Sequence, residues 1–279
     1  MARPRFFIDQ PHVHQVFAAD TDAFLRSDSE AYRHIVQVLR LGAGKSVELV
    51  QRGVWVTWLC TITSIDDEQV TLRVIEALES RELPFQTTLV LGFSKGDTNE
   101  KVVRQATELG VKRIIPVLLE RSISRPDAKR AKTKVERLRK IAASAAQQAH
   151  RSDLPVIEDL QSFAATVQMV EGLEADLIVV PWEEEGDHPL SACIKNTDLD
   201  SSSQATHVVV VIGPEGGISL DEITALRDIG ARSVSLGPTI LRVDTAACTA
   251  LAIVHDVLLQ ERAPERIVTS LEGGTETGA

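Results

Sequence analysis

Short apolar runs separated by turn residues mark the first 80 or so positions of the chain. Three runs rich in β-branched residues predict strands at Ser46–Val50, Val54–Ile62 and Val70–Val74. Glycines and the pair Asp66–Asp67 lie between these runs and favour turns. One intervening segment, Ser29–Leu39, has apolar residues at helical spacing. The pattern predicts a small β-barrel with one helix.

After the polar stretch Glu79–Pro84 the pattern changes to strands that alternate with helices. Strands are predicted at Thr88–Leu91, Ile114–Leu118, Leu177–Val180, Val208–Ile212 and Ser233–Leu236. Helices are predicted at Asn99–Leu109, Asp127–Ala149, Ser219–Ile229 and Thr245–Gln260. Because several of the strands are apolar throughout, we expect a parallel sheet that is buried on both faces in an α/β domain.

These patterns divide the chain into three parts. Residues 1–80 form the predicted barrel and residues 84–262 the α/β domain, with the polar stretch between them as the boundary. Residues 263–279 are rich in Gly, Thr and Glu, and we expect them to be disordered. Ser201–Gln204 is expected to be a polar surface loop.

Composition is that of a soluble globular protein, with 43% hydrophobic residues. The amino-terminal residues hold no long apolar stretch, so we expect no signal peptide. The best membrane segment, Ala246–Leu259, is judged too short and is interrupted by His255 and Asp256. Three cysteines far apart predict neither a disulfide framework nor a metal site. We therefore expect a cytoplasmic protein with no membrane partner.

The net charge of −10 argues against a nucleic-acid partner until its distribution is considered. The segment from Arg121 to Arg151 holds ten basic and two acidic residues, a net charge of +8. A local basic patch matters more to a phosphate backbone than the total charge does. A solvated helix face with scattered charges explains the segment equally well.

The strongest local motif follows the apolar run Val208–Ile212. The turn Gly213-Pro-Glu-Gly-Gly217 comes directly after it, and Ser219 with Glu222 predicts a capping box that opens the next helix. Open α/β sheets bind ligands beyond the carboxyl ends of their strands. The spacing fits neither a dinucleotide fingerprint nor a Walker loop, which excludes an ordinary dehydrogenase. A tight turn without a ligand is the alternative.

A second turn repeats this arrangement at Gly237-Pro238, and a weaker third one is Lys95–Asp97. Apolar Ile240 and Leu241 follow the second turn and lead to Arg242, Asp244 and Thr245 at the predicted start of a helix. Either Asp244 or Thr245 could cap that helix, and Arg242 could form a simple salt bridge. Two such turns at neighbouring strands favour one ligand crevice between them.

Together these segments resemble the SPOUT superfamily of RNA methyltransferases, and within it the bacterial 16S ribosomal RNA (uracil-N3)-methyltransferase family. The resemblance spans nearly the whole chain. It is carried by Arg5-Phe-Phe7, His34–Leu41, Lys95-Gly-Asp97, Ala106–Val111, Glu120-Arg121, Ile141-Ala142, Gln148, Arg151, Gly213–Gly217 and Leu236–Arg242. Where the family tends to have Arg-Thr-Glu-Thr, this chain has Arg242-Val-Asp-Thr245.

The resemblance implies a PUA-like barrel, a parallel-sheet methyltransferase domain with a deep trefoil knot, and a homodimer. It implies S-adenosylmethionine as cofactor and 16S ribosomal RNA or the small ribosomal subunit as partner. The implied cofactor residues are Gly213, Pro214, Glu215, Gly216, Gly217, Leu236, Gly237, Pro238, Ile240, Leu241 and Thr245. The RNA contacts expected from resemblance and charge are Arg5, His34, Arg40, Lys95, Arg121, Arg125, Lys129, Arg130 and Arg151.

The implied reaction is methylation of uracil N3, without a metal. A fixed guanidinium such as Arg242 could stabilise the charge that spreads onto O2 and O4 as the proton leaves. Asp244 could orient Arg242 or accept the proton, unless it only caps the helix. Two alternatives stay open: a 2′-O-ribose methyltransferase of the same superfamily, and a non-catalytic RNA-binding factor in ribosome assembly.

Overall fold

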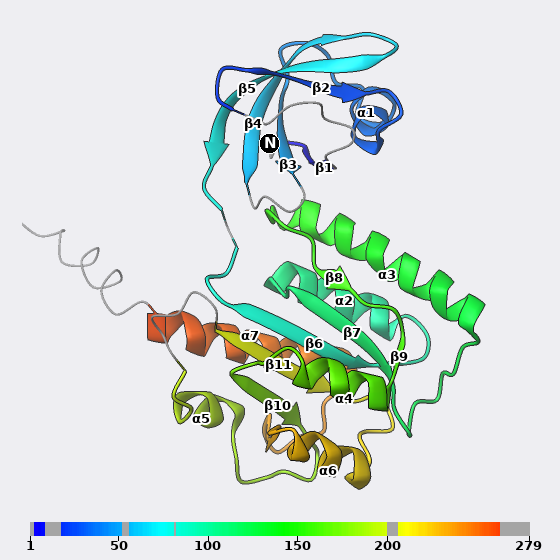
Figure 1. Ribbon diagram of the computed structural model, residues 1–279, viewed down its shortest axis with the longest axis vertical. Helices are drawn as coiled ribbons and strands as arrows, with labels where there is room; N and C mark the ends of the chain where they lie inside the picture. Colours follow the sequence, from blue (N-terminus) through cyan, green and yellow to red (C-terminus); the bar gives the residue numbers. More distant parts are fainter. Residues whose placement is uncertain (1–2, 9–17, 52–55, 81, 200–205, 263–279) are drawn as a thin grey trace, which may run out of the picture. The chain divides into compact units, whose positions relative to one another are not determined.

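The computed structural model describes residues 3–8, 18–51, 56–80, 82–199 and 206–262 (Figure 1). The polar loop predicted at 201–204 and the tail predicted at 263–279 lie outside these residues, as does the start of the strand predicted at Val54. Contacts divide the chain into two compact units. One comprises Met1–Glu82 with Ala143–Leu154, and the other Leu83–Ala142 with Pro155–Ala279. The division falls inside the polar stretch Glu79–Pro84, but the sequence gives no sign that Ala143–Leu154 groups with the first unit.

The first unit is built on a five-stranded sheet. Its strand order is β1-β3-β4-β5-β2, in which β1 runs parallel to β3 and the other neighbours are antiparallel. The bounds are β1 Arg5–Ile8, β2 Asp22–Arg26, β3 Ser46–Gln51, β4 Thr57–Ile65 and β5 Gln69–Leu78. Leu25, Leu49 and Leu72 are fully buried between these strands. The three strands predicted here are found, whereas β1 and β2 were missed because each is short.

The single helix predicted at Ser29–Leu39 is instead two consecutive elements. A short α-helix, α1 (Glu30–Arg33), begins at Ser29, whose hydroxyl accepts a hydrogen bond from Tyr32 N. A π-helix, η2 (His34–Val38), continues it. Three of its five residues are β-branched, and such side chains crowd the preceding helical turn. The wider turn keeps Ile35 fully buried in the first unit's core.

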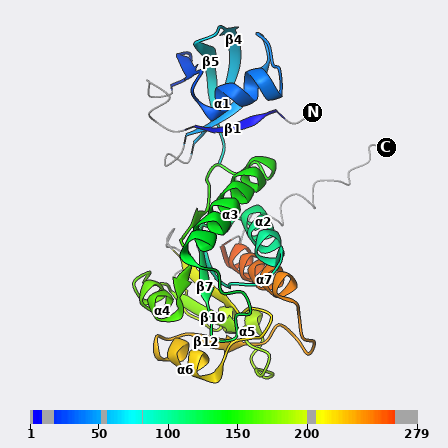
Figure 2. The same cartoon turned by 90° about the vertical axis from the view of Figure 1, so that its right-hand side faces the viewer.

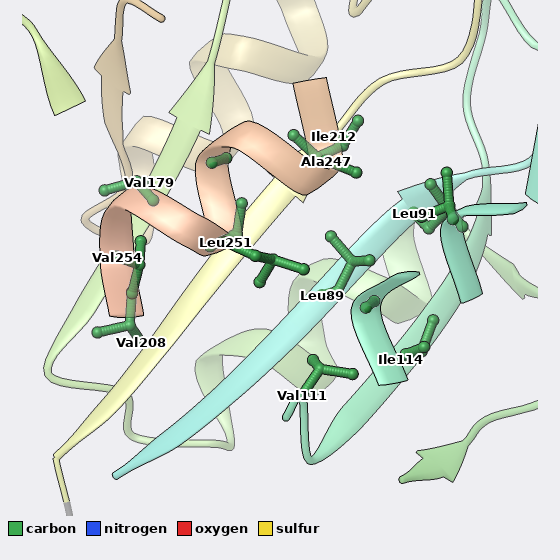
Figure 3. Packing of buried hydrophobic residues seen from close by; sticks show 14 of the residues in the cluster. Leu89, Leu91, Val111, Ile114, Val179, Val208, Ile212, Ala247, Leu251 and Val254 are labelled. Atoms are coloured by element: carbon green, nitrogen blue, oxygen red, sulfur yellow. The ribbon is translucent and has the colours of Figure 1, made fainter. Parts of the chain in front are cut away.

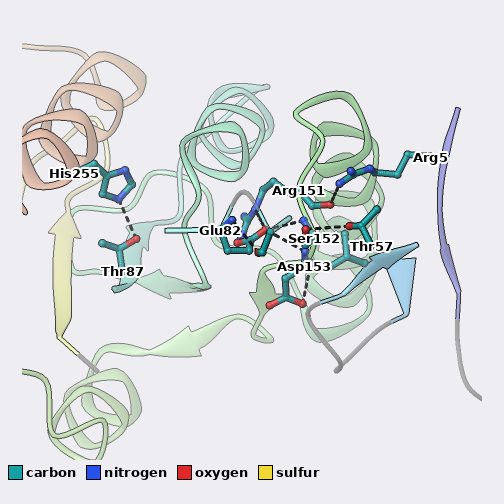
Figure 4. Close-up of polar contacts among 10 residues, drawn as sticks. Arg5, Thr57, Glu82, Thr87, Arg151, Ser152, Asp153 and His255 are labelled. Carbon is teal, nitrogen blue, oxygen red and sulfur yellow. Dashed lines mark hydrogen bonds and ion pairs between the residues drawn. The ribbon is translucent and has the colours of Figure 1, made fainter. Parts of the chain in front are cut away.

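Buried ion pairs attach Ala143–Leu154 to the rest of the first unit (Figure 4). The Arg5 guanidinium donates to Glu48 Oε2 at 2.9 Å and to the carbonyl oxygen of Arg151 at 2.6 Å. Arg151 donates in turn to Glu82 Oε2 at 2.8 Å, and the same carboxylate accepts from Ser152 N. Removing one partner of such a pair is costly because it leaves a buried charge unpaired. The cluster therefore fixes the path of the chain at Arg151 and Ser152.

The second unit is built on a parallel sheet, as predicted from the apolar runs. Its strand order is β12-β10-β11-β6-β7-β8, with β9 also beside β7, and every pairing is parallel. The bounds are β6 Gln86–Gly92, β7 Arg113–Leu118, β8 Val156–Ile157, β9 Gln161–Ser162, β10 Leu177–Pro181, β11 His207–Ile212 and β12 Arg232–Val234. Strands β8 and β9 have two residues each, too few to give a period in the sequence.

Helices cover both faces of this sheet (Figures 1 and 2). One face packs against α2 (Thr98–Leu109), α3 (Ala128–Gln148), α5 (Leu190–Lys195) and α7 (Val243–Arg262). The other packs against α4 (Phe163–Glu171) and α6 (Leu220–Asp228). In β11, Val208 and Val210 point into the first core, shown in Figure 3, and Val209 points into the second. This alternation explains why Val208–Ile212 is apolar at every position.

The terminal helix α7 is longer than predicted. It starts at Val243 and, of the described helices, is the one long and apolar enough to cross a membrane by length and composition. The expectation that this segment is too short was therefore wrong. Leu251 and Val254 on it are nevertheless buried in the core against the sheet (Figure 3). Core helices pass the same test of length and composition, so packing accounts for the apolar sequence.

Stability should depend on pH through His207 at the start of β11. Its Nε2 lies 2.8 Å from Thr88 Oγ1, and burial lowers the pKa of the imidazole. The unfolded chain has the ordinary histidine pKa of about 6.5. Below that pH the His207 imidazole binds a proton in the unfolded state but remains neutral in the folded state until the pH reaches its lower folded-state pKa. The stabilisation is therefore complete above pH 6.5 or so and is lost as the pH falls.

We expect the difference in unfolding free energy between wild type and His207→Gln to shrink between pH 8 and pH 5. Urea titrations at several pH values measure it, and an NMR titration of the His207 ring should give a midpoint below the ordinary value. A difference that grows toward acid pH contradicts the assignment.

Candidate functional site

Four strands of the second unit end at one edge of the sheet, and the loops that follow them surround a pocket. The strands are β6, β10, β11 and β12, which run in the same direction. The pocket has a volume of about 820 Å³. It is lined by residues of the loops after all four strands and by the start of α7. This is the position at which open α/β sheets bind ligands.

The turn after β11 packs too closely for ordinary side chains. Gly217 has a φ of +75°, a conformation that side chains disfavour, and a Cβ there would collide with the carboxylate of Glu183. A Cβ on Gly216 would lie 2.7 Å from the carbonyl oxygen of Arg121. The two glycines thus let neighbouring loops close around the pocket.

The predicted capping box opens α6 directly after this turn. Ser219 Oγ accepts from Glu222 N, and Glu222 Oε2 accepts from Ser219 N at 3.0 Å. The other oxygen of Glu222 accepts from Glu120 N at 2.7 Å. One buried carboxylate therefore caps the helix and ties the loop after β7 to it.

The turn after β12 forms the opposite wall. β12 ends at Val234, two residues before the predicted end, and the chain then bonds to the segment before α5 through Ser235. Leu236 to Arg242 line the pocket, and the side chain of Ile240 is 90% exposed. An apolar side chain that is so exposed at the mouth of a pocket is suited to cover a bound ring.

The weak third motif also lies in the pocket. Lys95 donates its backbone N–H to Glu215 Oε1 at 3.2 Å, which joins the loop after β6 to the turn after β11. Asp97 is the residue before α2, but its side chain makes no capping hydrogen bond and instead pairs with Lys101 at 3.2 Å. The motif is therefore part of the pocket wall rather than only a helix start.

The structure brings together ten of the eleven predicted cofactor residues in one pocket. They are Gly213, Pro214, Glu215, Gly216, Gly217, Leu236, Gly237, Pro238, Ile240 and Leu241. The eleventh, Thr245, does not line the pocket. Because α7 begins two residues earlier than predicted, Thr245 lies inside the first turn on an exposed position. Its assignment to the cofactor is corrected.

Arg242 and Asp244 both line the pocket, but they are not joined. The Arg242 guanidinium is exposed and forms no hydrogen bond or ion pair with the described residues. Asp244 Oδ1 accepts from Thr245 N at 3.1 Å. Asp244 lies within the first turn of α7, so neither it nor Thr245 is the residue that caps the helix. The capping hypothesis for both residues was wrong.

A fourth loop, after β10, was missed from the sequence. Pro181, Trp182, Glu183 and Glu185 line the pocket. Trp182 N donates to Val234 O at 3.1 Å, and the Arg227 guanidinium lies 5.5 Å from the centre of the indole ring. The signal was available: these residues follow a predicted strand, Leu177–Val180, at the carboxyl edge where ligands bind.

Two residues expected to contact RNA have another role. Arg5 and Arg151 are 9% and 4% exposed, and carboxylates of Glu48 and Glu82 bind their guanidinium groups. Groups that are so buried and paired are not available to phosphates. We therefore correct their assignment to a structural one.

The other predicted RNA residues are spread over several surfaces. Arg40 is exposed in a left-handed conformation with a φ of 50°, and His34 is half-buried beside the Phe6 ring. Arg125 donates to the carbonyl oxygens of Leu119 and Glu120 and so also holds a loop. Exposed side chains are found at Lys95, Arg121, Lys129 and Arg130.

The basic segment is partly neutralised by neighbouring acids. Arg130 pairs with Asp127, Arg137 with Glu100, and Arg139 with Glu136 and Asp159. Lys129, Lys132 and Lys140 on α3 are exposed and form no ion pair in the described part of the chain, and Lys134 contacts only Ser124 Oγ and the Phe93 ring. Neighbouring acids thus neutralise part of the segment, and four lysines of α3 keep a charge that is unpaired among the described residues.

The pocket itself is acidic. Asp97, Glu183, Glu185, Glu215 and Asp244 line it, against the basic residues Lys95, Lys101 and Arg242. An excess of one sign in a concave site raises the local concentration of ligands of the opposite sign. The electrostatics favour a ligand that carries positive charge.

Comparison with known proteins gives consistent matches. A family model for the RNA methyltransferase domain matches residues 81–255, and one for an RNA methyltransferase PUA domain matches residues 27–75. Ribosomal RNA small subunit methyltransferase E of Bacillus subtilis is 33% identical over 229 residues, which cover 81% of this chain and 87% of that protein.

Solved structures agree over a still larger share of the chain. A methyltransferase from Legionella pneumophila in complex with S-adenosylmethionine is 26% identical with a TM-score of 0.70, and the match covers 92% of this chain and 98% of that one. Ribosomal RNA small subunit methyltransferase E from Neisseria gonorrhoeae shares the fold, with a TM-score of 0.74 at 22% identity and the same coverage.

Replacing Gly217 should destabilise the protein. Gly217→Ala forces a side chain into a left-handed conformation and against the Glu183 carboxylate, so we expect the free energy of unfolding to fall by about 1–2 kcal/mol. The matched control is Gly186→Ala, where the new methyl group meets nothing within 4 Å and the φ is not left-handed. Urea unfolding of the two variants measures the difference. Equal losses would show that the turn tolerates a side chain.

Proposed function

This chain belongs to the family of RNA methyltransferases, and we propose that it transfers the methyl group of S-adenosylmethionine to uracil N3 of one uridine in small-subunit ribosomal RNA. The observation that carries the proposal is the pocket at the carboxyl edge of the parallel sheet, which is lined by ten of the residues that the resemblance implies for the cofactor. The relatives' names support the choice of RNA.

The residues present fit the cofactor. A volume of about 820 Å³ lies within the range of roughly 300–1,000 Å³ that small-molecule sites have. Leu236, Ile240 and Leu241 offer apolar surface for the adenine ring, and the glycine turns expose backbone groups to its polar edge. The excess of acidic side chains suits the positive charge of the cofactor.

Arg242 is the catalytic residue of the proposal. When bound, S-adenosylmethionine supplies an electrophilic methyl group. The acceptor N3 must lose its proton, and the resulting charge spreads onto O2 and O4 of the base. The unpaired guanidinium of Arg242 at the pocket can stabilise that charge. Asp244 remains the proposed proton acceptor, since its carboxylate lines the pocket without an ion pair to Arg242.

The remaining parts of the proposal concern the assembly. We propose that the protein acts in the cytoplasm as a homodimer, on free 16S ribosomal RNA or the assembled small subunit. The carboxy-terminal chain is proposed to form the trefoil knot that the resemblance implies. The match of residues 27–75 to a PUA domain of RNA methyltransferases supports a role of the first unit in holding RNA.

The substrate assignment can be tested directly. The purified protein is incubated with S-adenosylmethionine and small subunits from cells that lack the gene, and the methyl group is mapped by nuclease digestion and mass spectrometry. We expect one N3-methyluridine. Detection of a 2′-O-methyl group would show that the acceptor is a ribose and not uracil N3. Absence of S-adenosylmethionine binding would favour a non-catalytic assembly factor.

The same assay tests Arg242. Arg242→Gln should lower the single-turnover rate by about 10²–10³-fold, because one donor to the developing charge is lost. The affinity for S-adenosylmethionine, measured by calorimetry, should stay within about threefold. Arg242→Lys keeps the positive charge but loses the planar guanidinium geometry. Its single-turnover rate should lie between those of the wild type and Arg242→Gln. A rate for Arg242→Gln near that of the wild type removes Arg242 from the mechanism.

The free lysines of α3 should set the salt dependence of RNA binding. Each phosphate contact by a cation contributes roughly 0.7–0.9 to the slope of log affinity against log salt. Lys129→Ser with Lys132→Ser should therefore lower the slope by about one or more. The control is Lys195→Ser at the end of α5, an exposed lysine outside the basic segment. Equal slopes of log affinity against log salt for the wild type and the double variant would show that Lys129 and Lys132 do not contact RNA.

A further inference from the structure

One acidic side chain of the pocket differs from the others. Four of the five carboxylates have a partner: Asp97 pairs with Lys101, Glu185 with His188, Glu215 with Lys95 N and Asp244 with Thr245 N. In the described part of the chain, Glu183 has neither a hydrogen bond nor an ion pair. Its charge is therefore available to a ligand.

The turn after β11 is shaped to receive this carboxylate. Glu183 Oε1 occupies the space that a Cβ of Gly217 would need, and its carboxyl carbon lies 3.2 Å from that position. Any other residue at 217 would push the carboxylate away. Because residue 217 is a glycine, the Glu183 carboxylate can lie against the backbone of the turn. Gly213 and Gly216 of the same turn also line the pocket.

The loop that carries Glu183 is fixed on both sides. The preceding residue, Trp182, donates its backbone N–H to Val234 of β12, and its ring packs against the second core near the Arg227 guanidinium. Glu185 N donates to Trp182 O at 3.0 Å and closes the loop into a turn. The backbone at Glu183 therefore needs little reorganisation when a ligand binds, which increases the contribution of this residue to affinity.

We propose that the Glu183 carboxylate binds a cationic group at the methionine end of S-adenosylmethionine and makes the pocket select charged cofactors over neutral adenosine thioethers. This inference rests on the proposed function. The cofactor has two cations at that end, the sulfonium and the α-ammonium. Transfer of the methyl group removes the sulfonium charge. If Glu183 binds the sulfonium, it therefore contributes less to the affinity for the product, S-adenosylhomocysteine, than to the affinity for the substrate.

The test compares three ligands by isothermal titration calorimetry with the full-length protein. S-adenosylmethionine has both cations, S-adenosylhomocysteine only the ammonium, and 5′-methylthioadenosine neither. We expect Glu183→Gln to weaken S-adenosylmethionine roughly tenfold, as for loss of one charge-assisted contact, and to leave 5′-methylthioadenosine unchanged. An equal loss for S-adenosylhomocysteine identifies the ammonium as the partner, and no loss identifies the sulfonium. Both results support the proposal.

The matched control is Glu184→Gln, an exposed neighbour on the same loop that does not line the pocket. It should leave all three affinities unchanged, and both variants should melt at the wild-type temperature. Equal weakening of S-adenosylmethionine and 5′-methylthioadenosine by Glu183→Gln would reduce Glu183 to a structural role, and no weakening would remove it from the site. Absence of S-adenosylmethionine binding by the wild type would instead defeat the proposed function itself.

Discussion

Burial of both faces of the parallel sheet is the constraint on which the second unit depends. In β11, Val208 and Val210 pack into one helical layer and Val209 into the other. A strand enclosed in this way has no side chain free for chemistry along its length. Polar groups that meet a ligand must therefore come from the loops at the strand ends. Because the strands are parallel, the loops after β6, β10, β11 and β12 all leave at the same edge and define a single pocket.

At that edge the backbone determines the shape and a few carboxylates determine the charge. Gly216 allows contact with Arg121 and Gly217 allows contact with Glu183, so that two loops pack against one turn. The Glu222 carboxylate caps α6 and accepts a hydrogen bond from the loop after β7. These two contacts fix the end of the turn that leads into α6. Since the closing contacts involve backbone atoms, the pocket has its shape before a ligand arrives, and its acidic side chains face a preformed space.

Features with a period or a strict conformational requirement could be predicted from the sequence. The strand Val208–Ile212, the capping box of Ser219 and the glycine turns all belong to this group. Short elements such as β8 and β9 have no measurable period, and the start of α7 depends on where β12 ends, so Thr245 was misplaced. Trp182 and Glu183 were missed because their loop has no glycine signature, although it follows a predicted strand.

The charge counted along the sequence was the feature that predicted the structure least well, because the count ignores burial and pairing. A count along the sequence treats Arg151 and Lys129 alike, yet Arg151 is buried against Glu82 while Lys129 is exposed on α3. A buried guanidinium with a carboxylate partner adds almost nothing to the field outside the protein, whereas an unpaired surface ammonium contributes its whole charge until salt screens it. The unpaired charge that the basic segment presents to solvent is therefore smaller than +8, and on α3 it is carried by lysines such as Lys129, Lys132 and Lys140. An acidic chain thus presents charges of both signs to solvent, because unpaired lysines lie along α3 while a free carboxylate lies in the pocket.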